Sequence, residues 1–161
     1  MKKLLVLFSA LCCMAVAFAQ TPTIVTGHPD FKVKVTRCAA SGKVVVLDLV
    51  FTNVSANDVE EWSIQTGNYR FCNGPSIVYD SEGNIYNGMS MNCLAVKVSN
   101  LGYNGYHGNL KMIADVPMKV SLQITGVPTN VEALSRVDLS VKIPLFNINS
   151  PIKIKNIPIE R

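Results

Sequence analysis

Histidine is the commonest general base in enzymes, and this chain has two histidines around which catalysis could be organised. His28 stands two residues before Asp30, and His107 lies in a stretch of glycine, tyrosine and asparagine. A hydrolase must also bring a nucleophile and an orienting acid to such a base. The sequence contains no Gly-x-Ser-x-Gly, His-Glu-x-x-His, Walker or dinucleotide-binding motif. We therefore predict a non-catalytic protein that uses no cofactor.

Oxygen-bearing side chains at alternate positions mark one candidate for cation binding. Asp80, Glu82 and Asn84 follow the spacing of the first half of a calcium loop, but that loop requires a glutamate where this chain has Met91. The same residues, with Gly83 between them, fit a hairpin turn that is closed by a glycine at positive φ. We predict a turn here and no metal site, because the cysteines and histidines also lack the spacing of zinc ligands.

The segment 100–109 has the composition of a binding loop. Tyrosine offers flat stacking surfaces and asparagine offers adaptable hydrogen bonds, as in antibody paratopes, while glycine loosens the backbone. The candidate ligand-binding residues are Tyr103, Asn104, Tyr106 and His107. We predict a loop that could bind a protein or a glycan, with a merely solvated connection between strands as the alternative.

Residues 1–19 have the features of a secretory signal peptide. Two lysines precede an apolar run over 4–18, and Ala17 and Ala19 occupy the −3 and −1 positions of a cleavage site. The run is shorter than the roughly twenty residues that a membrane helix needs. We predict cleavage after Ala19 and an exported protein, periplasmic or extracellular, with no membrane span in the mature chain.

Composition limits the class of the mature protein. The chain of 161 residues is 48% apolar, which excludes a disordered protein and fits a single domain. Removing residues 1–19 takes two of the fifteen basic residues and none of the eleven acidic ones, so the net charge becomes +2. This weak charge, scattered along the sequence, predicts no nucleic-acid partner.

Three cysteines remain after cleavage, and an odd number cannot all pair within one chain. An oxidising compartment permits a disulfide. The favoured pair is Cys72 with Cys93, because the two flank the same predicted hairpin. A bridge to Cys38, or no bridge at all, stays open.

Alternation of apolar and polar residues with a period of two dominates the mature sequence and is typical of half-buried strands. We predict about seven to nine short strands and no helix longer than one turn, which indicates a two-sheet β-sandwich. Residues 59–62 fit either a helical turn or an irregular strand. The domain is expected to span 31–161, after an N-terminal lead over 20–30. The clearest strands are expected at 31–36, 43–53, 77–80, 85–87, 94–98, 119–125 and 136–143.

The C-terminal segment 150–161 carries isoleucines at alternate positions, with a slip near Asn156. Pro158 lacks a backbone N–H, which predicts that this strand lies at a sheet edge. The favoured interpretation is pairing within the chain's own sheet, in a monomer. The alternative is strand addition to another subunit, in which case the protein would self-associate as a structural surface or fimbrial-type subunit.

The order of these elements resembles the telokin-like, immunoglobulin-like domain of bacterial exported proteins of unknown function. The resemblance rests on the long strand that ends in Thr52-Asn53-Val54-Ser55, the hairpin around Asp80-Ser81-Glu82-Gly83-Asn84, and Gly126-Val127-Pro128 between two late strands. It covers about 31–143 and implies an immunoglobulin-like sandwich that acts as a binding or accessory module. The family supplies no catalytic residues, and the three mature cysteines and the isoleucine-rich tail depart from its pattern.

Overall fold

The computed structural model describes residues 21–67, 72–89, 93–149 and 151–161. The predicted signal peptide, 1–19, lies outside these residues. The described residues form eleven strands and one short 3-10 helix, η1, at Pro144–Phe146. The strands are β1 Thr23–Val25, β2 Phe31–Ser41, β3 Val44–Asn53, β4 Val59–Gln65, β5 Ile77–Asp80, β6 Ile85–Asn87, β7 Leu94–Val98, β8 Tyr106–Met112, β9 Met118–Thr125, β10 Ala133–Lys142 and β11 Pro151–Pro158.

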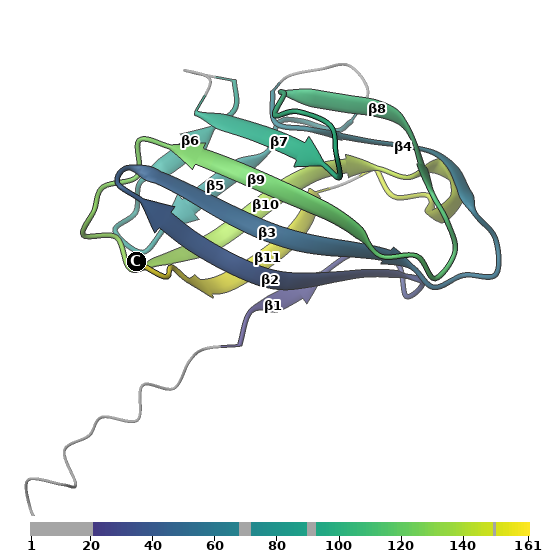
Figure 1. The fold of residues 1–161 in the computed structure, drawn as a ribbon, viewed down its shortest axis with the longest axis horizontal. Coiled ribbons are helices and arrows are strands. Elements are labelled where there is room, and N and C mark those ends of the chain that lie inside the picture. The colour runs from purple at the N-terminus through teal and green to yellow at the C-terminus, as the bar shows by residue number, and fades with distance from the viewer. Residues whose placement is uncertain (1–20, 68–71, 90–92, 150) are drawn as a thin grey trace, which may run out of the picture.

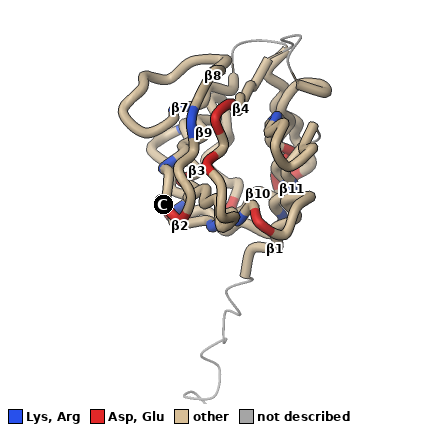
Figure 2. Tube along the Cα trace, turned by 90° about the vertical axis from the view of Figure 1, so that its right-hand side faces the viewer, with Lys and Arg blue, Asp and Glu red and all other residues tan. Residues whose placement is uncertain are grey.

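The strands make two antiparallel sheets that stack as a sandwich (Figures 1 and 2). The four-stranded sheet has the order β2-β3-β9-β7. The seven-stranded sheet has the order β1-β11-β10-β4-β8, with β5 also paired to β10 and β6 paired to β5. This arrangement confirms the predicted all-β, two-sheet sandwich, with more strands than the seven to nine expected.

Strand β3 shows why these residues form such layers. Its odd-numbered residues, from Val45 to Phe51, are buried, and its even-numbered residues are half-buried on the other side. Phe51 lies 5.8 Å, between ring centroids, from the fully buried Trp62 of β4. Trp62 is therefore an anchor between the two sheets, as its size predicts, and large aromatic side chains contribute most to such a core.

The β5–β6 hairpin has the predicted boundaries. The Asp80 carboxylate is buried and accepts hydrogen bonds from the backbone N–H groups of Glu82 and Asn84, from the Asn84 amide and from the Tyr86 hydroxyl, at 2.7–3.0 Å. Gly83 has a φ of 86°, as expected for the turn. Because four donors already occupy the Asp80 oxygens, the segment is a structural turn.

Strands β4 and β8 pair with each other, and neither strand was clearly predicted from the sequence. Residues 59–62 belong to a strand, so the helical-turn alternative is wrong. The predicted loop 100–109 is also wrong in its second half, because β8 begins at Tyr106. The pairing shifts register on both sides of Trp62. Such bulges break the alternation that sequence reasoning depends on.

The chain termini correct two further predictions. The lead expected over 20–30 contains β1, which pairs with β11. Strand β11 is not at an edge, since it lies between β10 and β1. Pro158 is tolerated there because β1 reaches only as far as Lys155, so no neighbour needs the missing N–H. The favoured prediction, pairing of this segment within its own sheet, is confirmed.

The end of the chain also joins the two sheets. After β11, the Glu160 N–H donates to the Cys38 carbonyl, and the Glu160 carbonyl accepts from the Ala40 N–H, both at 2.8 Å. This parallel contact covers part of the outer edge of β2. The sandwich is therefore closed along this seam by its own last residues.

Candidate functional site

The predicted binding segment crosses from one sheet to the other. Residues 99–105 leave β7 of the four-stranded sheet and enter β8 of the seven-stranded sheet (Figure 1). Asn104 exchanges two backbone hydrogen bonds with Val96, at 2.8 and 2.9 Å, and the Gly105 carbonyl accepts from the Thr66 N–H at 2.8 Å. Both sheets thus hold the segment, and its backbone geometry is set before any ligand arrives.

The four candidate residues have different surroundings within this segment. Tyr103 is 44% exposed and Leu101 is 45% exposed, so both offer apolar surface to solvent. Asn104 is also exposed, and its side-chain oxygen accepts from the Gly105 N–H. Tyr106 lies on β8, where its hydroxyl end is close to Gly108 and would collide with any side chain at that position. Only Tyr103 and Asn104 remain as exposed contact residues.

His107 has a structural position. It pairs in β8 with the inward-facing Ile64, and its ring Nε2 lies 2.9 Å from the Val96 carbonyl oxygen of β7. The ring therefore joins the edges of the two sheets by a hydrogen bond to the backbone. A catalytic histidine needs an acid to orient it and a nucleophile to activate, and the partner seen here is a carbonyl.

A hollow of about 240 Å³ adjoins the crossing segment. Gly88 sits against the Thr66 backbone, where any side chain would collide. Of the four candidate residues, Asn104 alone lines the hollow. The complete lining is Thr66, Gly67, Gly88, Leu94, Ala95, Asn104 and Gly105. The hollow was invisible in the sequence because its walls come from four separate segments.

A buried polar cluster lies where β4 and β10 meet. The Gly74 carbonyl accepts from the Gln65 amide at 2.9 Å and from the Ser140 hydroxyl at 2.7 Å, and the Ser76 hydroxyl donates to the Gln65 carbonyl at 2.5 Å. These bonds hold residues 74–76 against the sheet. Sequence reasoning missed this cluster, since serine and glutamine at strand positions usually indicate a solvated face.

The favoured disulfide, Cys72 with Cys93, is not formed in the structure. The Cys72 thiol faces the hydroxyls of Ser63 and Ser140, whereas the Cys93 thiol donates to the Asn87 carbonyl at 3.3 Å. Burial raises the pKa of both thiols, and it raises the pKa of Cys38 to about 12. Thiols with raised pKa values are poor nucleophiles and poor metal ligands.

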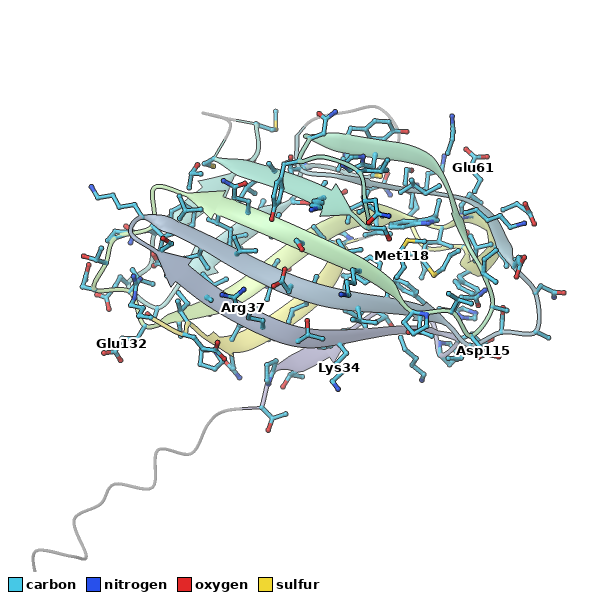
Figure 3. The ribbon with its side chains drawn as sticks, in the orientation of Figure 1. Lys34, Arg37, Glu61, Asp115, Met118 and Glu132 are labelled. Carbon is cyan, nitrogen blue, oxygen red and sulfur yellow. The ribbon has the colours of Figure 1, made fainter. Side chains whose placement is uncertain are left out.

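Five cations share one face of the molecule, although they are scattered along the sequence. They lie on the outer side of the four-stranded sheet, which we call the basic face (Figure 3 labels Lys34 and Arg37 on β2). Its cations are Lys32, Lys34, Arg37, Lys97 and Lys119. The expectation of evenly scattered charge therefore fails in three dimensions. Alternation along each strand was the available signal, but it does not show which strands are neighbours.

Comparison with known proteins adds no relative. No family model, curated protein or solved structure matches the chain.

Within the described residues, no helix has the length and apolar character that a membrane crossing needs. The same residues contain no group of three or more histidine, cysteine, aspartate or glutamate side chains placed to hold a metal ion.

Proposed function

We propose that this chain is an exported, non-catalytic binding or accessory module of the immunoglobulin-like type, which engages a protein or glycan partner through residues 99–105. The observation that carries the proposal is the crossing segment itself. It is held by backbone hydrogen bonds to both sheets, and it presents Leu101, Tyr103 and Asn104 to solvent beside a hollow. A preformed segment loses little conformational entropy on binding, so its exposed side chains contribute more of their contact energy to affinity.

The non-catalytic part of the proposal is supported by the positions of the titratable groups. His107 is hydrogen-bonded to a backbone carbonyl, and His28 stacks on the Phe146 ring with centroids 4.6 Å apart. The thiols have raised pKa values, as described above. A histidine held by a backbone carbonyl, a histidine stacked on a phenyl ring and thiols with raised pKa values are poorly suited to act as a base or a nucleophile.

Strand addition through the C-terminal segment, the alternative function, receives no support from the fold. Residues Pro151–Pro158 already pair with β10 along most of their length and with β1 at 153–155. Donation of this strand to a neighbour would first require breaking both ladders. We therefore do not propose it.

The proposed function is tested by a glycan array and by a pull-down from the native cell envelope, with the purified protein and two sets of variants. Tyr103→Ala and Asn104→Ala alter the exposed side chains of the crossing segment. Ile85→Ala is the matched control, because Ile85 is 63% exposed on β6, outside that segment. We expect ligand retention to fall at least about tenfold in the first set and to remain unchanged in the control. Retention that survives both changes in the crossing segment would exclude it as the binding site.

Export is tested separately by N-terminal sequencing of the protein recovered from cells. A mature chain that starts at Gln20 is expected. A chain that still starts at Met1 and stays in the cytoplasm would contradict this part of the proposal.

A further inference from the structure

The basic face combines residues from three strands into one compact patch. Lys34 pairs with Val50, and Val50 pairs with Lys119 on the far side, so these two lysines are two strand spacings apart, or about 10 Å. A second row crosses all four strands, from Arg37 through Asp48 and Ser121 to Lys97. Its two ends, Arg37 and Lys97, are three strand spacings apart, or about 14 Å. The five cations therefore fit within the length of a short oligomeric ligand.

The charge of this face is not neutralised by neighbours. The ion pairs among the described residues are Lys111 with Asp58, Lys111 with Glu60, and Arg136 with Asp138, all on the other sheet. Asp48 is the one acidic side chain among the outward positions of the four-stranded sheet, which the structure describes in full. Glu160 pairs with Ala39 farther along β2, beyond the cation rows. An excess of unpaired positive charge on one face attracts anions.

A β-bulge shapes the centre of the patch. The register of β2 against β3 shifts between Val35 and Arg37, and the extra residue, Thr36, donates its hydroxyl to the Asp48 carbonyl at 3.1 Å. An open hollow of about 430 Å³ lies here, lined by Thr36, Asp48, Leu49, Val50, Lys119 and Ser121. The bulge thus provides a recess with hydroxyl and carboxylate groups inside a ring of cations.

We propose that the basic face binds an acidic polysaccharide, a chain of sugars that carry carboxylate groups. Lysine and arginine side chains would pair with the carboxylates, which arginine can contact in a bidentate manner. The Asp48 carboxylate, which accepts from the Ser121 hydroxyl at 2.6 Å, would accept further hydrogen bonds from sugar hydroxyls in the recess. This site is separate from residues 99–105, so it extends the proposed function and does not depend on it.

The chemistry of the face favours this ligand over other anionic partners. None of the large exposed apolar side chains lies on it, so it offers neither a stacking platform for nucleobases nor an anchor for insertion into a membrane. Protein interfaces usually centre on large aromatic or aliphatic anchors, whereas the apolar side chains of β3 on this face, Val44, Val46 and Val50, are small and half-buried. A carboxylate in the middle of the cations opposes densely charged phosphates but accepts hydroxyl donors. The face therefore matches a ligand that alternates anionic groups with hydroxyls.

The test measures binding of the purified protein to immobilised polygalacturonate by biolayer interferometry, with neutral dextran as the uncharged polymer. The informative variant is Lys32→Ala/Lys34→Ala. Its matched control is Lys153→Ala/Lys155→Ala, which removes two exposed lysines with the same spacing from the outer side of β11. We expect the first variant to bind polygalacturonate about tenfold more weakly and the control to change less than about twofold.

Several results would overturn the proposal. These are no binding to polygalacturonate, equal weakening by both lysine pairs, or equal binding to dextran. Vesicles of phosphatidylglycerol and a single-stranded oligonucleotide serve as competing polyanions, and tighter binding to either would assign the face to a membrane surface or a nucleic acid instead. Circular dichroism of each variant checks that loss of binding does not reflect unfolding.

Asp48 provides a sharper test of the ligand class. Asp48→Asn removes the negative charge and should tighten binding to the oligonucleotide more than binding to polygalacturonate. The ratio of the two affinities is therefore expected to shift toward the oligonucleotide by about threefold or more. An unchanged ratio would show that Asp48 does not select for hydroxyl-rich ligands.

Discussion

The two sheets of the sandwich differ in how their charged side chains are partnered. On the seven-stranded sheet, Arg136 donates to both oxygens of Asp138, at 2.6 and 2.7 Å, and the Asp80 carboxylate accepts from four donors. On the four-stranded sheet, five cations lie around a single carboxylate without an ion pair among the described residues. The first arrangement stabilises the fold, whereas the second leaves charge available for a partner. Substitutions of charged residues on the two sheets should therefore affect different measurements.

The largest effect on stability is expected for Asp80→Ala. The substitution leaves the Tyr86 hydroxyl, the Asn84 side chain and two backbone N–H groups of the turn without their acceptor, in a buried site. We expect the free energy of unfolding in urea to fall by about 3 kcal/mol. Glu82→Ala in the same turn is the control, since Glu82 is exposed, and should change stability by less than about 0.5 kcal/mol. Equal effects of the two changes would show that the Asp80 network does not hold the hairpin.

The same carboxylate should make stability depend on pH. Burial alone would raise the pKa of Asp80, but hydrogen bonds from Asn84, Tyr86 and the turn backbone outweigh it and hold the pKa below its ordinary value of 3.8. The ionised form therefore stabilises the fold above that value, and this contribution is lost as pH falls through the lower pKa of the folded state.

Asp80→Asn isolates this effect. We expect the difference in unfolding free energy between the parent protein and this variant to be largest near pH 7 and to shrink as the pH falls below about 3.8. Urea unfolding at several pH values measures it. A difference that stays constant down to the lowest pH at which the parent folds would contradict an ionised Asp80 in the native state.

A smaller effect is expected for Asp138→Ala on the same sheet. Asp138 is 8% exposed, and its removal takes away both charge-assisted hydrogen bonds of Arg136, whose guanidinium also lies 5.9 Å from the centroid of the Tyr79 ring. We expect a loss of about 1 to 2 kcal/mol, because charge-assisted bidentate pairs exceed ordinary surface pairs. Lys153→Ala, opposite Asp138 in β11, is the control and should change the unfolding free energy by less than about 0.5 kcal/mol.

The smallest effect on stability is expected on the basic face. Lys34→Ala/Lys119→Ala removes two cations that have no ion pair within the described chain. The unfolding free energy should change by less than about 0.5 kcal/mol, or rise slightly as repulsion decreases. Added salt should stabilise the parent protein more than this variant, because screening weakens repulsion among the cations. A loss above about 1 kcal/mol would show that these lysines are part of the fold's own support.

Local turn chemistry and alternation were enough to predict much of this fold. The β5–β6 hairpin was placed correctly because Asp80, Gly83 and Asn84 determine a turn through neighbours only a few residues away. Strand β7 was also placed correctly, since its apolar residues alternate without interruption. Strand β8 was missed because Gly108 and Asn109 interrupt it and because bulges shift its register against β4.

The candidate sites were predicted less well, and the reason is long-range pairing. The composition of residues 99–105 suggested binding, but the roles of His107 and Tyr106 depended on where β7 and β8 lie relative to each other. Cys72 and Cys93 flank a hairpin in sequence, yet their thiols contact different elements. The basic face was not foreseen, because nothing local links Lys34 with Lys119.

The amino-acid sequence by itself determined the layers of this protein, since alternation decides which side of each strand avoids water. It also determined the tight turn at Gly83, where only local conformational preference matters. Tertiary structure alone decided which strands became neighbours, and with that it decided which charges share a face and which are paired. The physical reason is that burial of apolar side chains acts on every strand separately. A patch of charge, in contrast, forms only when strand pairing brings residues from different strands side by side.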